Sequence, residues 1–263
     1  MTSNTSAGLD AEFREPHSAD PALFVFNTAA NWIGGRVPDG TATISARIAP
    51  QFQQPVTFSR ATTNLGAINL TGVLPLQVMA GQTLELKGAG LVLLSTGIVF
   101  RGAVRGHAVL RSLDPAHFGY LSGPVLESVG TFEGSVDNIS GSVFSGRGNN
   151  LGSDTMTIQG NYQQGHEDRV PQPKYPTLWN AVDAKGLSLL KVVGRADLLP
   201  DASLAFVVME GEVPPLDREV AVLTATAGLH GVFEHVSIEP PYRVSSLRYD
   251  DNGAYAILSM IRN

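Results

Sequence analysis

Apolar and polar residues alternate along several short segments of the chain, a pattern typical of strands with one buried face. In residues 41–48 the alanines and isoleucines at even positions fall on one face, and threonine, serine and arginine fall on the other. The alternation returns at 74–78, 83–87, 108–110 and 155–159. Glycine, asparagine, aspartate and proline separate these segments at intervals of roughly eight to twelve residues, which is the spacing of a β-sandwich, barrel or solenoid.

Helical periodicity is missing from the sequence, so we expect an all-β fold. The inward positions of the alternating segments should form its hydrophobic core. The residues predicted to be buried are Ile44, Leu76, Leu84, Leu86, Leu110, Met156 and Ile158.

The last third of the chain reads as a series of short strands that ends in a hairpin. The expected strands are 158–162, 187–190, 204–208, 220–223, 231–233 and 247–258. Within the last of them, Asp251-Asn252-Gly253 predicts a tight turn, because an Asn-Gly pair tolerates positive φ at both central positions.

The order of motifs in this third resembles the C-terminal passenger segment of bacterial autotransporters and related surface-exposed β-solenoid proteins. The matching stretches are a G-x-Y-x-Q strand at 160–164, L-x-V-x-G-x-A-x-L at 190–198, VLTA at 222–225, G-x-F at 231–233 and Tyr-Asp at 249–250. At the front, 31–38 resembles the A-N-W…G-G-x-V-P opening of many large bacterial exoproteins. The resemblance implies a right-handed, single-stranded parallel β-helix with capping segments at both ends.

This architecture divides the chain into four parts. We expect a flexible N-terminal segment at 1–22, β-solenoid rungs at 23–162, a protruding proline-rich loop at 163–186, and a C-terminal solenoid with a hairpin cap at 187–263. Trp32, near the front, can be a sugar-stacking platform or a buried lid over the first rung, and we favour the lid.

The loop at 163–186 departs from the family pattern, which usually has only a few small polar residues there. A loop of this length in a compact domain is often functional. Its candidate residues for binding a glycan or a partner protein are Tyr175, Trp179, Asn180 and Asp183. The alternative, which we favour, is that the two aromatic residues attach the loop to the solenoid wall.

Composition excludes several functional classes. The net charge is −6 and only 16% of the 263 residues are charged, so no basic surface is expected for nucleic acid. The chain has no cysteine, which removes disulfides and thiolate chemistry. The longest apolar stretch, 90–100, is too short to span a membrane, and residues 1–20 lack the apolar run of a signal peptide.

Candidates for catalysis or metal binding are few. Glu133 and Asp137 share strand parity and are the weak candidates for an acid and base pair, although acids on a strand surface are usually only solvated. His107, Asp114 and His117 fall close together in sequence without the spacing of a known metal motif. We therefore predict no metal and no cofactor.

Two functions of different classes follow. The first is a non-catalytic structural or adhesive module, extracellular or at the cell surface. Its expected partner is a surface glycan or protein, or a second copy that associates through the exposed strand edges of the solenoid ends. The second is a carbohydrate-active β-helix enzyme, a polysaccharide hydrolase or lyase, with Glu133 and Asp137 as acid and base.

Overall fold

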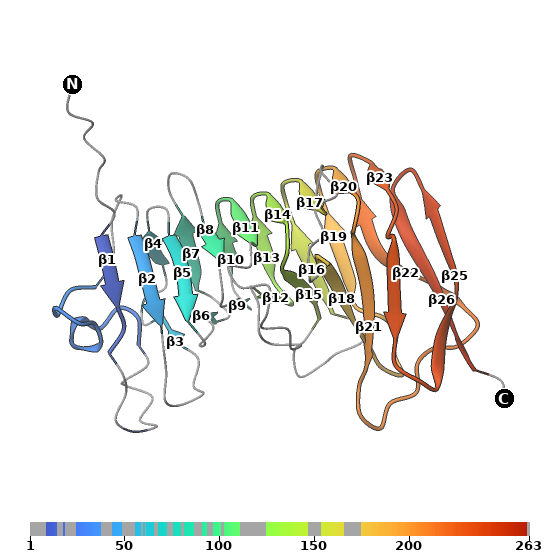
Figure 1. The fold of residues 1–263 in the computed structure, drawn as a ribbon, viewed down its shortest axis with the longest axis horizontal. Coiled ribbons are helices and arrows are strands. Elements are labelled where there is room, and N and C mark those ends of the chain that lie inside the picture. Colours follow the sequence, from blue (N-terminus) through green and yellow to red (C-terminus); the bar gives the residue numbers. More distant parts are fainter. Residues whose placement is uncertain are drawn as a thin grey trace.

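The computed structural model describes residues 9–14, 18, 25–37, 44–48, 56–58, 60, 62–65, 68–72, 76–79, 82–86, 91–93, 97–100, 103–110, 125–146, 154–165 and 175–261. Across these ranges the chain forms strands and one 3₁₀ turn, η2 (Ala29–Asn31). The chain advances along the long axis of the molecule from its N-terminal strands to the C-terminal ones (Figure 1). No helix among the described residues is long and apolar enough to cross a membrane.

Three sheets run through the stack, and the chain visits them in turn. The first sheet contains β1 (Leu9–Glu12), β2 (Ile44–Ile48), β5 (Ile68–Gly72), β8 (Leu91–Leu93), β11 (Ala108–Leu110), β14 (Val136–Asn138), β17 (Tyr162–Gln164), β20 (Ala196–Leu198) and β23 (Leu229–Gly231). The second sheet contains β3 (Val56–Thr57), β6 (Leu76–Val78), β9 (Gly97–Phe100), β12 (Val125–Ser128), β15 (Ser142–Ser145), β18 (Thr177–Val182), β21 (Ser203–Val208) and β24 (His235–Ile238).

The third sheet completes each rung and ends in the only antiparallel pairings of the described strands. It contains β4 (Thr62–Leu65), β7 (Thr83–Leu86), β10 (Ala103–Arg105), β13 (Thr131–Glu133), β16 (Thr155–Ile158), β19 (Leu189–Val192), β22 (Glu219–Ala225), β26 (Gly253–Met260) and β25 (Tyr242–Asp250). From β2 to β21, each strand pairs in parallel with the strand numbered three higher, as β13 does with β16. The parallel β-helix expected from the sequence is confirmed.

Apolar side chains stack in register through the interior. In the third sheet one inward column passes from rung to rung through Leu84, Val104, Phe132, Ile158 and Val192, all fully buried. Burial of a large apolar side chain contributes about 1.5–3 kcal/mol, so such columns supply much of the stability of the coil.

The predicted core residues are buried wherever their exposure is described. Leu84, Leu110, Met156 and Ile158 are all fully buried. The side chains of Ile44, Leu76 and Leu86 lie outside the described burial, although their backbones form part of β2, β6 and β7.

One corner of the coil requires glycine. Gly134, Gly160 and Gly194 follow β13, β16 and β19, and the N–H of each later glycine donates to the carbonyl of the one before, at 2.8 and 3.0 Å. A Cβ on Gly160 or Gly194 would lie 2.5 Å from the carbonyl oxygen of the preceding glycine. The glycines of two of the sequence motifs are therefore fixed by the close approach of successive rungs.

The front of the stack is closed by aromatic packing. Trp32 is fully buried and makes edge contacts with Phe13 and Phe26, with ring centroids 5.0 Å apart in both pairs. Its indole N–H donates to the carbonyl of Phe26 at 2.7 Å. The buried-lid interpretation of Trp32 is confirmed, and the sugar-platform alternative is wrong because neither ring face is open.

The back of the stack is closed by the predicted hairpin of β25 and β26, with β26 paired to β22. The turn differs from the prediction: Asp251 and Asn252 form it, and Gly253 begins β26. Neither Asn252 nor Gly253 has a positive φ. The Asp250 carboxylate accepts a hydrogen bond from the N–H of Asn252 at 3.0 Å, which stabilises the turn without a left-handed residue.

Two expected elements are corrected by the strands. Residues 158–162 are not one strand, because a turn between Ile158 and Tyr162 separates β16 from β17. The segment expected to be flexible, 1–22, contains β1, whose Leu9 and Ala11 pair with Ile44 and Ala46. The strand was not predicted because its alternating pattern has only two apolar residues, Leu9 and Ala11.

The loop expected at 163–186 is also interrupted. Residues 177–182 form β18, paired in parallel with β15 and β21 as an ordinary rung of the second sheet. The strand was not predicted because prolines and charged residues precede it and because one of its inward residues, Asn180, is polar, between the apolar Leu178 and Val182. Of the expected protrusion, residues 166–174 lie outside the described part of the chain.

Candidate functional site

Trp179 lies in the middle of β18, on the outer side of the second sheet. Its ring is parallel to that of Phe144 on the preceding rung, with centroids 6.0 Å apart, and its indole N–H donates to the Ser142 hydroxyl at 3.3 Å. The side chain is half-buried, whereas Phe144 is only 4% exposed. These contacts support the interpretation that Trp179 packs on the solenoid wall.

Tyr175 lies just before β18, at the corner between the first and second sheets. The phenol ring stacks on the imidazole of His235, with centroids 3.9 Å apart and planes 21° from parallel. Tyr175 remains 43% exposed, which makes it the most accessible of the four predicted binding residues.

Asn180 points into the coil and cannot reach a ligand on the surface. Its side chain is fully buried, and its amide N–H groups donate to the Val222 carbonyl at 3.2 Å, to the Ser145 hydroxyl at 3.4 Å and to the Ser188 carbonyl. The inclusion of Asn180 in a binding site is therefore wrong. Strand alternation explains this, because Asn180 follows the outward-facing Trp179.

Asp183 stabilises a turn. Its carboxylate accepts hydrogen bonds from the backbone N–H of Lys185 at 2.7 Å and of Gly186 at 3.1 Å, and the residue is 6% exposed. The four predicted binding residues therefore do not converge: Tyr175 lies at a corner, Trp179 on the outer wall, Asn180 in the interior and Asp183 in the turn after β18.

The predicted acid pair is divided between two sheets. Glu133 ends β13 in the third sheet, where its carboxylate lies 2.5 Å from Nε of Arg105; Glu85 lies on the other side of that arginine, 3.8 Å away. Asp137 lies in β14 of the first sheet, with its carboxylate 3.1 Å from Nε2 of His107. Each acid thus has a nitrogen-bearing partner on the neighbouring rung: Arg105 for Glu133 and His107 for Asp137. Asp114 and His117 lie outside the described residues.

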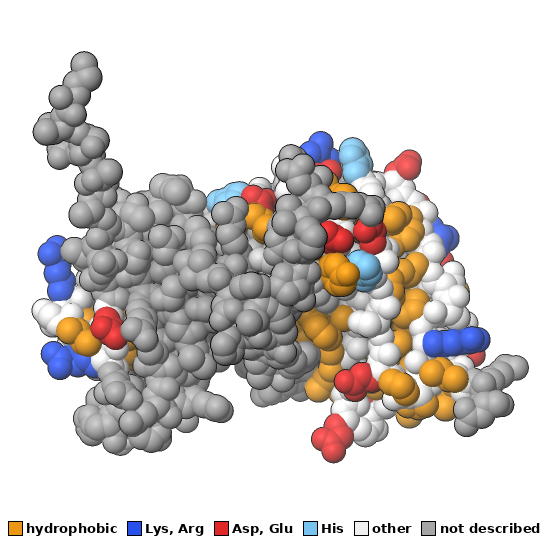
Figure 2. Space-filling view, in the orientation of Figure 1, with side chains coloured by type: hydrophobic (Ala, Val, Ile, Leu, Met, Phe, Trp, Pro, Cys, Tyr) orange, Lys and Arg blue, Asp and Glu red, His pale blue; other side chains and the backbone are white. Residues whose placement is uncertain are grey.

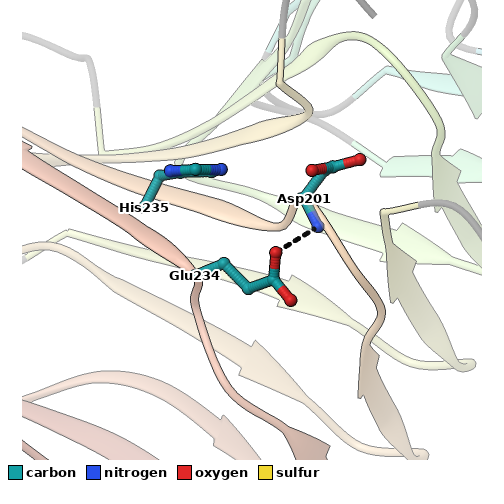
Figure 3. Close-up of side chains that lie close together, drawn as sticks. All are labelled: Asp201, Glu234 and His235. Atoms are coloured by element: carbon teal, nitrogen blue, oxygen red, sulfur yellow. Dashed lines mark hydrogen bonds between the residues drawn. The ribbon is translucent and has the colours of Figure 1, made fainter. Parts of the chain in front are cut away.

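A cluster that sequence inspection missed lies at the corner next to Tyr175. One ligand-type atom from each of Asp201, Glu234 and His235 falls within 4.8 Å of the others. The carboxylate of Glu234 accepts a hydrogen bond from the backbone N–H of Asp201 at 3.2 Å (Figure 3). On the face shown in Figure 2, acidic, histidine and hydrophobic side chains lie next to one another on the described part of the C-terminal half.

The register of the coil builds this cluster from residues 33 positions apart. Ser203 of β21 pairs with His235 of β24. Asp201 precedes Ser203 by two residues and Glu234 precedes His235 by one, so this pairing brings the two acidic residues next to each other. The N–H of Glu234 donates to the Ala202 carbonyl at 2.9 Å, which holds the two corners together. Only the register of the rungs, which the sequence pattern did not supply, could have predicted the cluster.

Comparisons of the chain with protein-family models and with curated proteins found no match. The β-solenoid fold therefore stands on the structure, and the autotransporter resemblance stands on the motifs of the chain.

Proposed function

We propose that the chain is a non-catalytic structural or adhesive β-solenoid module that acts outside the cell or at its surface, like the passenger segments its motifs resemble. The observation that carries this proposal is the uninterrupted parallel stack of three sheets, closed by aromatic packing at the front and by a hairpin at the back. In a rod of stacked rungs each rung contacts only its neighbours, so adding rungs provides length and a repetitive surface.

The outer wall supports a structural role. Several of its charged residues are paired, between rungs in Glu85, Arg105 and Glu133 on the third sheet and within one rung in Arg195 and Asp197, 2.8 Å apart. Exposed pairs of this kind contribute little to stability, and they give the outer wall charged side chains that already have partners.

The best-supported contact surface for a glycan or protein partner is the corner around Tyr175. Val232, which lies between β23 and β24, is 50% exposed, and Tyr175 is 43% exposed. An accessible aromatic ring beside carboxylates can stack on a sugar face or pack against a partner protein.

The test compares Tyr175→Ala and Trp179→Ala with Val193→Ala, an exposed apolar residue at another corner. Binding is measured on glycan arrays and bacterial or host cell surfaces, and stability by thermal unfolding. We expect Tyr175→Ala to lose binding at an unchanged melting temperature, Trp179→Ala to lower the melting temperature through the lost Phe144 contact, and Val193→Ala to do neither. A Tyr175→Ala protein that binds like the wild type would refute the contact surface.

The carbohydrate-active enzyme is the weaker alternative. It requires two carboxyl groups about 5–5.5 Å or 6.5–9.5 Å apart across a sugar-binding groove. Glu133 and Asp137 lie in different sheets, and carboxylates from different rungs meet instead at Asp201 and Glu234, within 4.8 Å and together with an imidazole. Release of reducing ends from polysaccharides that is abolished by Glu133→Gln or Asp137→Asn would establish the enzyme and overturn the proposal.

A further inference from the structure

We propose that Asp201, Glu234 and His235 bind a divalent transition-metal ion, with Zn²⁺ as the best-fitting ion. The three candidate ligand atoms already lie within 4.8 Å of one another without an ion. The ligands around a tetrahedral Zn²⁺ are about 3.3 Å apart, given bonds of about 2.0 Å, so small side-chain rotations complete the site. The proposal of this metal site does not rest on the proposed surface function, although Tyr175 lies next to both.

The donor set selects the class of metal. An imidazole nitrogen suits zinc, copper, nickel and iron, whereas calcium and magnesium prefer oxygen ligands alone. Two carboxylates and one imidazole make three protein ligands with a combined charge that offsets a divalent cation. Because all three side chains lie at the surface of the corner, with Glu234 exposed and the other two half-exposed, water can fill the remaining coordination position.

The imidazole of His235 is held in place and has nitrogens to offer. The ring of Tyr175 covers one of its faces, with centroids 3.9 Å apart, which limits rotation of the histidine. Within the part of the chain that the structure describes, neither ring nitrogen of His235 and neither carboxylate oxygen of Asp201 forms a hydrogen bond. Both groups therefore keep lone pairs for a cation.

The backbone brings the ligands together before any metal binds. Asp201 has a φ of 68°, a left-handed conformation that places its side chain over the corner and its N–H on the carboxylate of Glu234. The N–H groups of Glu234 and His235 both donate to the carbonyl of Ala202, at 2.9 and 3.3 Å. The ion would thus join the last two rungs of the first and second sheets, and its binding would stabilise the folded C-terminal end.

The direct experiment is calorimetric titration of ZnCl₂ into chelator-treated full-length protein, with thermal unfolding in Zn²⁺ or in EDTA. We expect one bound ion and a higher melting temperature in Zn²⁺. His235→Ala and Asp201→Asn should each weaken binding at least about tenfold. Asparagine is chosen at position 201 because it also tolerates a positive φ.

His107→Ala is the matched control, because His107 is a half-exposed histidine that also lies beside a single carboxylate. It should bind Zn²⁺ like the wild type. Melting temperatures in EDTA show whether each variant is folded, and Asp201→Asn carries the test if His235→Ala does not fold. Wild-type protein that binds no Zn²⁺, or the same affinity in both ligand variants, would overturn the site. The site would also be overturned if Ca²⁺ bound as tightly as Zn²⁺ and its affinity were unchanged in His235→Ala.

Discussion

At the residue scale, the G-x-Y-x-Q motif has a structural explanation. Tyr162 and Gln164 both point into the coil and are fully buried. The Tyr162 hydroxyl donates to the side-chain carbonyl of Gln164 at 2.6 Å, and the Gln164 amide donates to the backbone carbonyls of Pro176 and Ser203, both at 2.7 Å. One glutamine thus bonds to polar groups of β17, of the residue before β18 and of β21, at the corner where the chain leaves the first sheet.

Gln164→Ala should destabilise the protein by roughly 3 kcal/mol, because it removes three buried hydrogen bonds worth about 1 kcal/mol each. The free energy of unfolding in urea measures the effect. Gln163→Ala is the control: its side chain points outward on the same strand and should cost less than about 0.5 kcal/mol. Equal losses in the two variants would contradict this role for Gln164.

Stability at alkaline pH should depend on Tyr162. Burial raises the pKa of its hydroxyl above the ordinary value. In the unfolded chain a tyrosine loses its proton near pH 10, while the buried one keeps it, so the free energy of unfolding should fall as pH rises above about 10.

Urea unfolding between about pH 8 and pH 11 measures this fall. Tyr162→Phe should make it shallower. Tyr249→Phe should do so less, because burial also raises the pKa of the Tyr249 hydroxyl but that side chain is only partly buried. A fall of the same steepness in wild type and Tyr162→Phe would show that other groups cause it.

At the element scale, alternation along a strand decides what each side chain can do. In β21 the side chains of Leu204 and Phe206 point inward, and in β18 the same parity turns Asn180 inward and Trp179 outward. Asn180 is one of the polar residues in a mainly apolar interior, and its Oδ1 has no hydrogen-bond partner among the described residues. Such a strand looks like a polar loop in the sequence although it is a rung.

Phe206→Ala should cost about 3–5 kcal/mol, because the ring is 2% exposed and belongs to the continuous core. Val207→Ala, on the outer side of the same strand, should cost under about 1 kcal/mol. Chemical denaturation of both variants measures the difference. Similar small losses would place the Phe206 ring outside the core.

At the scale of the whole molecule, the two ends of the stack determine which strand edges are open to another chain. The hairpin covers the edge of β22 and buries Ala254, Ala256 and Leu258. An uncovered parallel stack presents open strand edges on which another chain can add. The hairpin is also joined to β22 at its surface, where Arg248 binds Glu219 and Asp250; hydrogen bonds from Arg248 lower the pKa of both carboxyl groups.

Deletion of residues 240–263 should cause self-association, because it removes β25 and β26 and exposes the edge of β22 and the apolar residues beneath it. Size-exclusion chromatography with light scattering measures the effect. Arg248→Gln, which keeps the hairpin and removes an exposed ion pair, should stay monomeric with little change in melting temperature. A truncated chain that is monomeric and melts like the wild type would show that the hairpin is not a cap.

The sequence by itself determined the fold class and the two caps. Short alternating segments predict strands, the ordered motifs indicate a coil, and Trp32 near the front indicates a lid. Each of these predictions depends only on residues that are neighbours along the chain. Local alternation also identified the buried positions Leu84, Leu110, Met156 and Ile158.

Only the tertiary structure decided which residues meet across rungs. Residues 33 positions apart form the Asp201, Glu234 and His235 cluster, and β18 takes its place between β15 and β21 despite its loop-like composition. The physical reason is register: a strand shifted by one residue turns every side chain to the opposite face, and the length of each corner sets that register. Corner lengths in this chain vary, so contacts between rungs are decided by the backbone pairing and not by the local pattern.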